Sequence, residues 1–165
     1  MNIIIEKSSE EHAEAIAHIC STGWTQTVVG KLSEEYQKKN IAFWYNHERV
    51  KKDITQGTYT HVALNNSKVI GVIGGGMTKP DTGEVFVLYV DESYRYKGIG
   101  KQLLSALTKQ QIEKGVSEQW VSVQEDNYRA IPFYEARGFV DREKRTTTTE
   151  TGENQVSIRY SRKVK

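Results

Sequence analysis

The spacing of apolar residues predicts mainly helices in the first third of the chain. Between residues 13 and 20, apolar side chains recur every three or four positions, which gives a helix one apolar face, and one of the serines at 8–9 is placed to cap its start. Ser33 and Asn46 are N-cap candidates for two shorter helices. The apolar run at 3–5, ahead of all three, is expected to be a strand.

From residue 58 onward the pattern is that of short strands joined by tight turns, at Asn65-Asn66-Ser67 and at Pro80-Asp81-Thr82-Gly83. A helix over about 98–114 separates two of these strands, so that pair is expected to be parallel with a right-handed crossover. A short helix over 130–137 ends at Gly138, which suits a left-handed C-cap. The expected strands are Thr58–Leu64, Lys68–Ile73, Glu84–Val90, Gln119–Val123, Val140–Thr147 and Gln155–Arg162.

These elements predict an α/β fold of the α+β type. Its centre is a mixed, mostly antiparallel sheet of about seven strands with helices on its faces. Neither a Ser/Gly-rich linker nor an internal repeat divides the chain. Residues 1–165 are therefore expected to form a single domain.

Composition narrows the function classes. Hydrophobic residues make up 37% and charged residues 27%, which argues against disorder, and a net charge of +2 gives no general attraction to nucleic acid or to a membrane surface. The single Cys20 excludes an internal disulfide, and the four histidines lack metal-ligand spacing, so no metal site is expected. Without a signal-peptide-like or membrane-spanning stretch, the protein is expected to be soluble and cytoplasmic.

An aromatic cluster lies among the predicted N-terminal helices. Phe43, Trp44 and Tyr45 are consecutive, and Trp24 and Tyr36 are near them in sequence. We favour the interpretation that these rings fill the core. The alternative is that some of them, Trp24, Tyr36 and Trp44 above all, form an aromatic wall for the cationic or apolar part of a substrate.

The strongest chemical signal is a basic, glycine-bearing loop between a predicted strand and a predicted helix. Three cations, Arg95, Lys97 and Lys101, lie within seven residues around Gly98 and Gly100. A helix N-terminus leaves backbone N–H groups unpaired and carries partial positive charge, so it binds anions, and glycines let a phosphate approach the backbone. The loop is therefore a candidate phosphate site. A plain turn that needs glycine is the alternative.

Two nucleotide-binding motifs do not fit this loop. A Walker loop requires glycine where Arg95 stands and Ser or Thr where Gln102 stands, and a dinucleotide fingerprint requires glycine at Leu103. What fits is the pattern R-x-x-G-x-G.

In that pattern and two flanking segments, the chain resembles the GCN5-related N-acetyltransferases. Arg95, Gly98 and Gly100 match the family's Q/R-x-x-G-x-G/A loop. Glu84–Val90 (EVFVLYV) matches its preceding strand, and Asn127–Phe139 (NYRAIPFYEARGF) matches its later N-x-x-A-I/L-x-F/L-Y-x-x-x-G-F segment. The order and spacing of the three also agree. The first third of the chain carries no matching motif, and that part selects the acceptor in this family.

The resemblance implies that acetyl-CoA lies in a cleft where two neighbouring parallel strands splay apart. The backbone of Leu88 and Val90 would pair with the pantetheine arm, the amides of residues 96–101 would hold the pyrophosphate, and Asn127 would hydrogen-bond the pantetheine. The cofactor-binding residues expected in this way are Leu88, Tyr89, Val90, Arg95, Tyr96, Lys97, Gly98, Ile99, Gly100, Lys101, Asn127 and Phe133.

Transfer of an acetyl group to an amine requires two proton movements. A protonated amine has no lone pair for attack, and the leaving thiolate gains from a proton donor. By the resemblance, Tyr134 is the candidate general acid and Glu84 the candidate base; the alternatives are a packing role for Tyr134 and a solvated strand-end charge for Glu84. Glu125 and Asp126 are weaker base candidates.

The sequence thus predicts an acetyl-CoA-dependent N-acetyltransferase that acts by direct transfer to a primary amine. The acceptor is a small molecule, polyamine-like or amino-acid-like, or else a protein or peptide amine. The acids Glu84, Asp91, Glu92, Glu125 and Asp126 near the expected mouth mildly favour a cationic acceptor. A non-catalytic acyl-CoA sensor and, remotely, a nucleic-acid-binding domain are the rival interpretations, and a homodimer is plausible.

Overall fold

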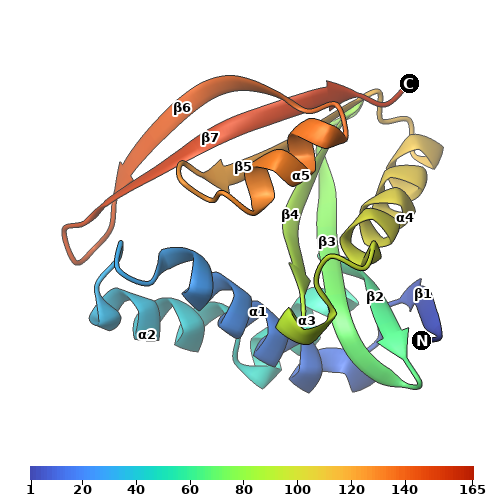
Figure 1. Ribbon diagram of the computed structural model, residues 1–165, viewed down its shortest axis with the longest axis horizontal. Coiled ribbons are helices and arrows are strands. Elements are labelled where there is room, and N and C mark those ends of the chain that lie inside the picture. Colours follow the sequence, from blue (N-terminus) through green and yellow to red (C-terminus); the bar gives the residue numbers. More distant parts are fainter.

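A seven-stranded sheet runs through the molecule, whose computed structural model describes all residues from 1 to 165 (Figure 1). The strand order is β1-β2-β3-β4-β5-β7-β6, and every neighbouring pair is antiparallel except β4 and β5, which are parallel. The mixed, mostly antiparallel sheet is therefore confirmed. The strands are β1 (Ile3–Lys7), β2 (Tyr59–Asn65), β3 (Lys68–Lys79), β4 (Thr82–Val90), β5 (Glu118–Gln124), β6 (Val140–Thr148) and β7 (Asn154–Lys163).

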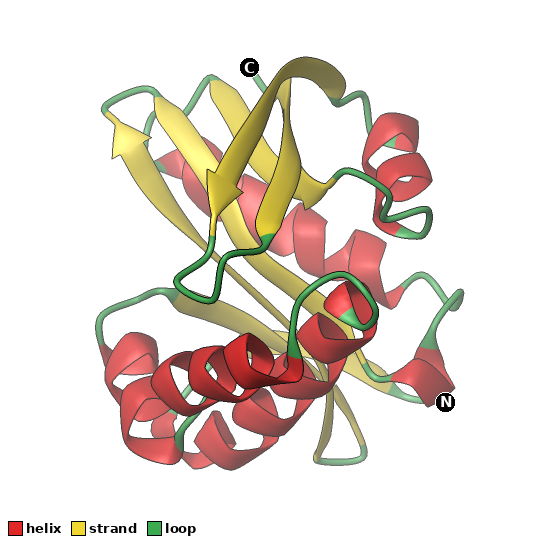
Figure 2. Cartoon of the chain, turned by 90° about the vertical axis from the view of Figure 1, so that its left-hand side faces the viewer, coloured by secondary structure: helices red, strands yellow, loops and turns green.

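Helices cover both faces of this sheet and make two core clusters. On one face α4 (Ile99–Glu113) and α5 (Ala130–Ala136) pack against β3, β4, β5 and β7, with Leu103, Leu104 and Leu107 fully or almost fully buried. On the other face α1 (Ala13–Val28) and α3 (His47–Thr55) cover β2 and β3. The helix α2 (Glu34–Trp44) lies beside α1, so the helical layer in the foreground of Figure 2 leaves the C-terminal strands uncovered on that face.

The parallel strands β4 and β5 are paired at only four positions. Pairing runs from Thr82 opposite Glu118 to Val85 opposite Val121, although both strands continue beyond these residues. A bulge at Phe86 changes the register between β3 and β4, because Gly74 pairs with Val87 while Gly75 pairs with Val85. A bulge bends its strand and increases its twist. This bend leaves an open split between the C-terminal halves of β4 and β5.

The helix starts follow the sequence closely. The Ser33 hydroxyl accepts a hydrogen bond from the Tyr36 amide, and the Asn46 side chain accepts one from the Arg49 amide, so both predicted caps are confirmed. Ser9 caps a short 3₁₀ turn, η1 (Glu10–His12), which leads into α1. That helix continues to Val28, well past the apolar face at 13–20, and Cys20 is fully buried in it as expected.

Two details differ from the sequence interpretation. The strand β3 continues to Lys79 through three glycines. Glycine is needed at Gly74 and Gly75, because a Cβ at either position would lie only 2.3 Å from a backbone oxygen. In α4 it is Gln111, not Ile112, that is fully buried, since its side chain is bonded to other buried polar groups.

No helix of the structure combines the length and the apolar character needed to cross a membrane.

The aromatic cluster is only partly in the core: Tyr45 packs against the buried residues of α1 and α3, but Phe43 and Trp44 do not. Phe43 is 57% exposed and Trp44 is 41% exposed, because both rings point outward from the end of α2 and stack on the Arg49 guanidinium at 5.1 and 4.4 Å. The core interpretation is therefore wrong for these two residues. Trp24 and Tyr36 are half-buried against each other, with ring centroids 6.3 Å apart.

Candidate functional site

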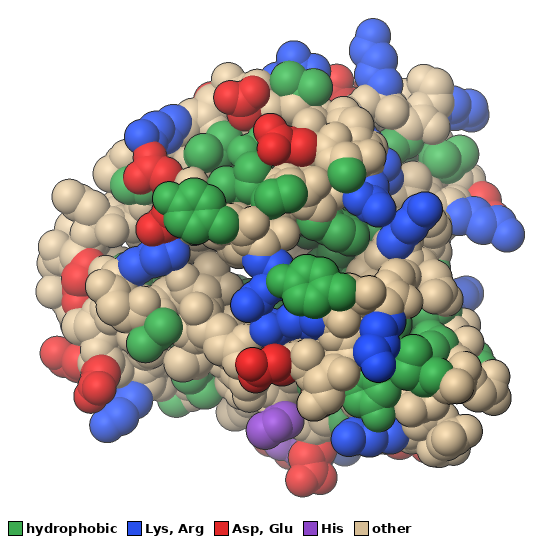
Figure 3. All heavy atoms as spheres, viewed as in Figure 1, with side chains coloured by type: hydrophobic (Ala, Val, Ile, Leu, Met, Phe, Trp, Pro, Cys, Tyr) green, Lys and Arg blue, Asp and Glu red, His purple; other side chains and the backbone are tan.

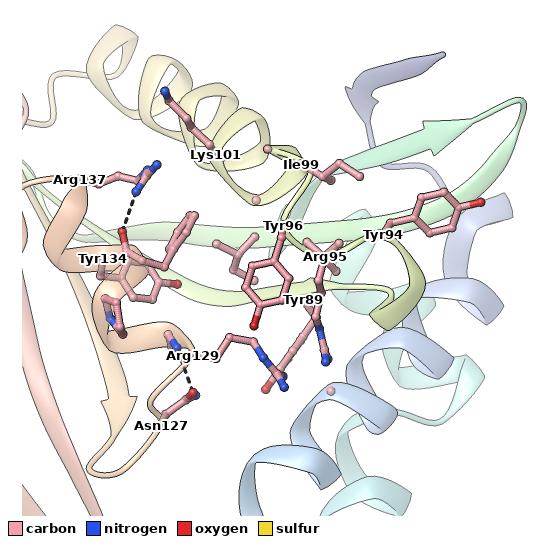
Figure 4. Close-up of a pocket in the computed structure, with 18 of the residues that line it drawn as sticks. Tyr89, Tyr94, Arg95, Tyr96, Ile99, Lys101, Asn127, Arg129, Tyr134 and Arg137 are labelled. Atoms are coloured by element: carbon pink, nitrogen blue, oxygen red, sulfur yellow. Dashed lines mark hydrogen bonds between the residues drawn. The ribbon is translucent and has the colours of Figure 1, made fainter. Parts of the chain in front are cut away.

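A cavity of about 610 Å³ occupies the split between β4 and β5. Its wall is built from the end of β4, the loop and first turn of α4, the segment that leads into α5, and one side of α1. Figure 4 shows polar tips of Tyr89, Arg95, Tyr96 and Arg129 gathered at one end and Tyr134 toward the other. The site is therefore elongated, with a cationic end and an aromatic end.

The loop before α4 has the backbone geometry of an anion site. Tyr96 and Gly98 both have left-handed φ angles, of 62° and 80°, and Gly98 is the N-cap residue of α4. A tyrosine rarely adopts this conformation, and such strain concentrates at ligand-binding turns. Left-handed residues next to a helix start turn successive N–H groups toward one point, where an anion can accept from them.

Cations surround this loop without a full set of partners. The Arg95 guanidinium donates to the Gln26 side chain at 2.5 Å, and the Gln26 amide in turn donates to Glu92 at 3.1 Å. Burial, and after it the repulsion from the Arg129 guanidinium, lower the pKa of Arg95. A bound phosphate would relieve this repulsion. Figure 3 shows Lys and Arg side chains gathered beside the hollow at the middle of this face.

Two glycines let parts of the wall come close together. A Cβ on Gly100 would lie 3.3 Å from the Phe133 ring, so a larger residue would narrow the cavity between α4 and α5. A Cβ on Gly23 would lie 2.3 Å from the Tyr89 ring. Gly23 therefore allows α1 to lie directly against β4, and this contact closes the cavity on the α1 side.

The middle of the cavity offers unpaired strand backbone. The segment that includes Leu88 and Val90 has no partner on the β5 side, because the parallel pairing stops at Val85. The Asn127 side-chain oxygen accepts at 3.0 Å from the amide of Ala130, the first residue of α5, while its NH₂ group has no such bond. These groups can pair with an amide-containing chain laid along β4.

The aromatic end of the cavity holds Tyr134. Its ring makes edge contacts with Phe133 and Phe139 at centroid distances of 5.1 and 5.3 Å, and only 6% of the residue is exposed. Burial raises the pKa of Tyr134 above the ordinary value of a phenol. The hydroxyl points into the cavity (Figure 4), and because its pKa is raised it keeps its proton at neutral pH and can donate there.

Glu84 lies outside the cavity wall, at the closed end of the split. Both of its carboxylate oxygens accept from the Arg159 guanidinium, at 2.8 and 3.1 Å, and both side chains are more than four-fifths buried. Arg159 also donates to the Ser122 hydroxyl at 2.8 Å and stacks over the Trp120 ring at 5.1 Å. The carboxylate therefore has a fixed orientation, with its charge balanced.

The structure brings most of the sequence-predicted residues to this one cavity. Lys97 is not on the wall; its ammonium lies 6.0 Å from the centroid of the Tyr94 ring. Trp24, Tyr36 and Trp44 do not line the wall either. The predicted residues that do line it are Leu88, Tyr89, Val90, Arg95, Tyr96, Gly98, Ile99, Gly100, Lys101, Asn127, Phe133 and Tyr134.

The wall also contains residues that sequence reasoning missed. Arg129 and Arg137 belong to the matched segment 127–139, and their charge near an expected phosphate was a usable signal. The sequence carried no such signal for Gly23 and Thr27, because their position in the wall depends on how α1 packs on β4. The missed residues are Gly23, Thr27, Tyr94, Tyr128, Arg129, Ala130, Pro132 and Arg137.

The wall suits a long ligand with an anionic end and an amide-bearing arm. The left-handed loop and the cations fit a pyrophosphate, the unpaired backbone of β4 fits a pantetheine arm, and Tyr134 stands at the far end. Coenzyme A has these parts in this order. The residues present therefore fit a coenzyme A thioester.

Comparisons with known proteins agree with this geometry. The sequence profile of the acetyltransferase (GNAT) family matches residues 15–139. The spermidine N(1)-acetyltransferase of Thermoplasma acidophilum is 30% identical over 144 residues, which cover 84% of this chain and 89% of that protein. A crystal structure of PaiA N-acetyltransferase from the same organism, in complex with coenzyme A, superposes with a TM-score of 0.80 at 27% identity and covers 99% of both chains. The ribosomal protein bS18-alanine N-acetyltransferase of Escherichia coli is 36% identical over 59 residues, 36% of this chain and 40% of that protein.

Proposed function

Because this chain belongs to the acetyltransferase (GNAT) family, we propose that it transfers the acetyl group of acetyl-CoA directly to a primary amine. The observation that carries the proposal is the open split between β4 and β5, which joins the anion-binding loop at 95–101 to the buried hydroxyl of Tyr134 in one cavity. Acetyl-CoA supplies the acetyl group as a thioester.

The residues of the cavity would bind and orient the donor. Arg95, Arg129 and the amides of the loop before α4 hold the phosphates, and Leu88 and Val90 hold the arm through their backbone. A thioester fixed in this way meets an amine as if at very high concentration, which supplies a large part of the catalysis. No covalent enzyme intermediate is needed, since the only cysteine, Cys20, is buried away from the cavity.

Tyr134 is the proposed general acid. Because burial raises its pKa, the hydroxyl keeps its proton until the leaving sulfur takes it. Phe133 and Phe139 hold the ring in place from two sides.

Glu84 is the proposed base, acting through water. Its oxygens already accept from Arg159, but each retains a further lone pair that a water molecule can use. The water would pass the amine's proton to the carboxylate. Glu84→Gln should lower kcat by about a hundredfold at pH 7, and the loss should shrink as the pH approaches ~10, where a lysine-like amine deprotonates without help. A loss that is the same at every pH would assign Glu84 a structural role only.

The acceptor is a polyamine-like or amino-acid-like small molecule, or else a peptide amine. The relative from T. acidophilum is named for spermidine and that from E. coli for a ribosomal-protein alanine, so the family resemblance extends to both kinds of amine.

The test is thiol release from acetyl-CoA with a panel of polyamines, amino acids, aminoglycosides and peptides with free N-termini or lysines. Saturable release with one class is the expected result, and Arg95→Gln should raise the KM for acetyl-CoA. Binding of acetyl-CoA without release of thiol by any amine would contradict the catalytic proposal, and failure to bind acetyl-CoA would contradict the whole proposal.

A further inference from the structure

The acidic residues that would attract a cationic acceptor are mostly paired with bases. Of the five acids near the expected mouth, three contact a basic side chain from a different element. Asp91 instead caps its own turn by accepting from the Ser93 amide, and Glu92 accepts from Gln26. The three ion pairs are Glu84 with Arg159, Glu125 with Lys144, and Asp126 with Lys31.

Only one of these pairs is buried. The side chains of Glu84 and Arg159 are 18% and 13% exposed, whereas those of the other two pairs are between 35% and 61% exposed. Exposed pairs are screened by solvent and salt, so they change little in the field that a ligand meets. The Glu84–Arg159 pair is not screened in this way, and its bidentate geometry holds the two charges together.

The buried pair lies beside the split, on the face of the sheet opposite α4. Glu84 is opposite Trp120, one position before the last pair of residues at which β4 and β5 are still paired. Val85 follows Glu84 on β4, and Tyr160 follows Arg159 on β7. Both Val85 and Tyr160 face the α4 side of the sheet. Because successive side chains of a strand point to opposite faces, Glu84 and Arg159 face the other side. On that side no helix covers the C-terminal strands (Figure 2). An amine that reaches the split from this open face therefore meets the pair.

We infer that Arg159 sets the charge preference of the acceptor site. By cancelling the Glu84 carboxylate, it makes the site fit an acceptor whose only positive charge is the reacting amine, such as an amino-acid-like or peptide amine, rather than a polyamine. The inference rests on the proposed function and narrows its acceptor class. A second ammonium beside Arg159 would meet a like charge next to a carboxylate that is already paired, whereas Glu84 alone would attract it.

Binding to the protein loaded with coenzyme A tests this without requiring turnover. Calorimetry at physiological salt would compare spermidine with n-butylamine, which carries one amine. The wild-type complex should bind spermidine no more tightly than butylamine. Arg159→Gln should bind spermidine about tenfold more tightly than the wild type and change butylamine binding much less.

Three variants separate the charge effect from structural damage. Arg159→Lys keeps the charge and should show no gain. Arg159→Gln combined with Glu84→Gln removes both charges and should lose the gain. Lys109→Gln removes one positive charge from an exposed position on α4, on the other face of the sheet, and should leave the ratio unchanged.

Two results would overturn the inference. One is a wild-type complex that binds spermidine more than tenfold more tightly than butylamine, a result that needs no variant to fold. The other is a folded Arg159→Gln variant with an unchanged ratio. Failure of the proposed function looks different, because it appears as absence of thiol release with every amine while these binding ratios are still measurable.

Discussion

Tyr134→Phe removes one hydroxyl from the aromatic end of the cavity and leaves the ring. The ring accounts for the packing, because Phe133 and Phe139 contact it at 5.1 and 5.3 Å and only 6% of the residue is exposed. A phenylalanine can keep both contacts. We therefore expect the free energy of unfolding to change by less than about 1 kcal/mol.

The effect on the reaction should be much larger. A positioned general acid contributes about 10²–10⁴-fold to a rate, which corresponds to roughly 3–5 kcal/mol of barrier. Because the phosphate end of the cavity is untouched, the KM for acetyl-CoA should stay within about threefold of the wild type. Since burial raises the pKa of Tyr134, the wild-type kcat should show no alkaline loss near the ordinary phenol value of ~10.

The assay is the single-turnover rate of thiol release, measured with thermal unfolding of the same samples. Tyr128→Phe is the matched control, since Tyr128 also lines the cavity but is 83% exposed, and its hydroxyl should be dispensable. A Tyr134→Phe rate within about threefold of the wild type would refute the general-acid role, whatever the melting temperature does.

Three further changes test other parts of the structure. Gly100→Val should weaken acetyl-CoA binding at least about tenfold in calorimetry, since even a Cβ at this position would lie 3.3 Å from the Phe133 ring and the larger valine would narrow the cavity. Unchanged affinity would contradict the cavity assignment. Gln119→Leu should cost about 2–4 kcal/mol in urea unfolding, because this fully buried amide bonds three other polar side chains; a loss below 1 kcal/mol would show that they find other partners. Hydrogen bonds from the Ser33 amide and two threonines lower the pKa of Glu153 to about 2. The wild type should therefore be more stable than Glu153→Gln above the unfolded-state pKa of ~4.3, and it should lose that advantage as the pH falls toward 2. A melting-temperature difference that is independent of pH would contradict this.

The loop end of the cavity could be predicted because it is local in sequence. The loop at 95–101 and the segment 127–139 carry their own glycines, cap and charges, and these features determine the backbone with little help from the rest of the fold. The alternating strands were also predictable, since most of them have one face more buried than the other, although β6 is exposed along its whole length. Only their ends differed, as in β3, where close backbone contacts require glycine inside a strand.

The Glu84–Arg159 pair could not be predicted in the same way. Glu84 and Arg159 are 75 positions apart, and nothing in the residues around either one indicates the other. The outward rings of Phe43 and Trp44 show a related difficulty. Aromatic composition predicts burial on average, but stacking on Arg49 stabilises these rings at the surface, and periodicity in a short helix does not distinguish the two.

The strand order has a consequence for how the chain is made. β7 lies between β5 and β6, although it is synthesised after both. Until it emerges from the ribosome, β6 has no partner and β5 presents an open edge that can pair with another chain. Every residue of the cavity wall precedes position 138, whereas Arg159 belongs to β7. A growing chain therefore contains all the residues of the cavity wall while the guanidinium that balances Glu84 has yet to be added.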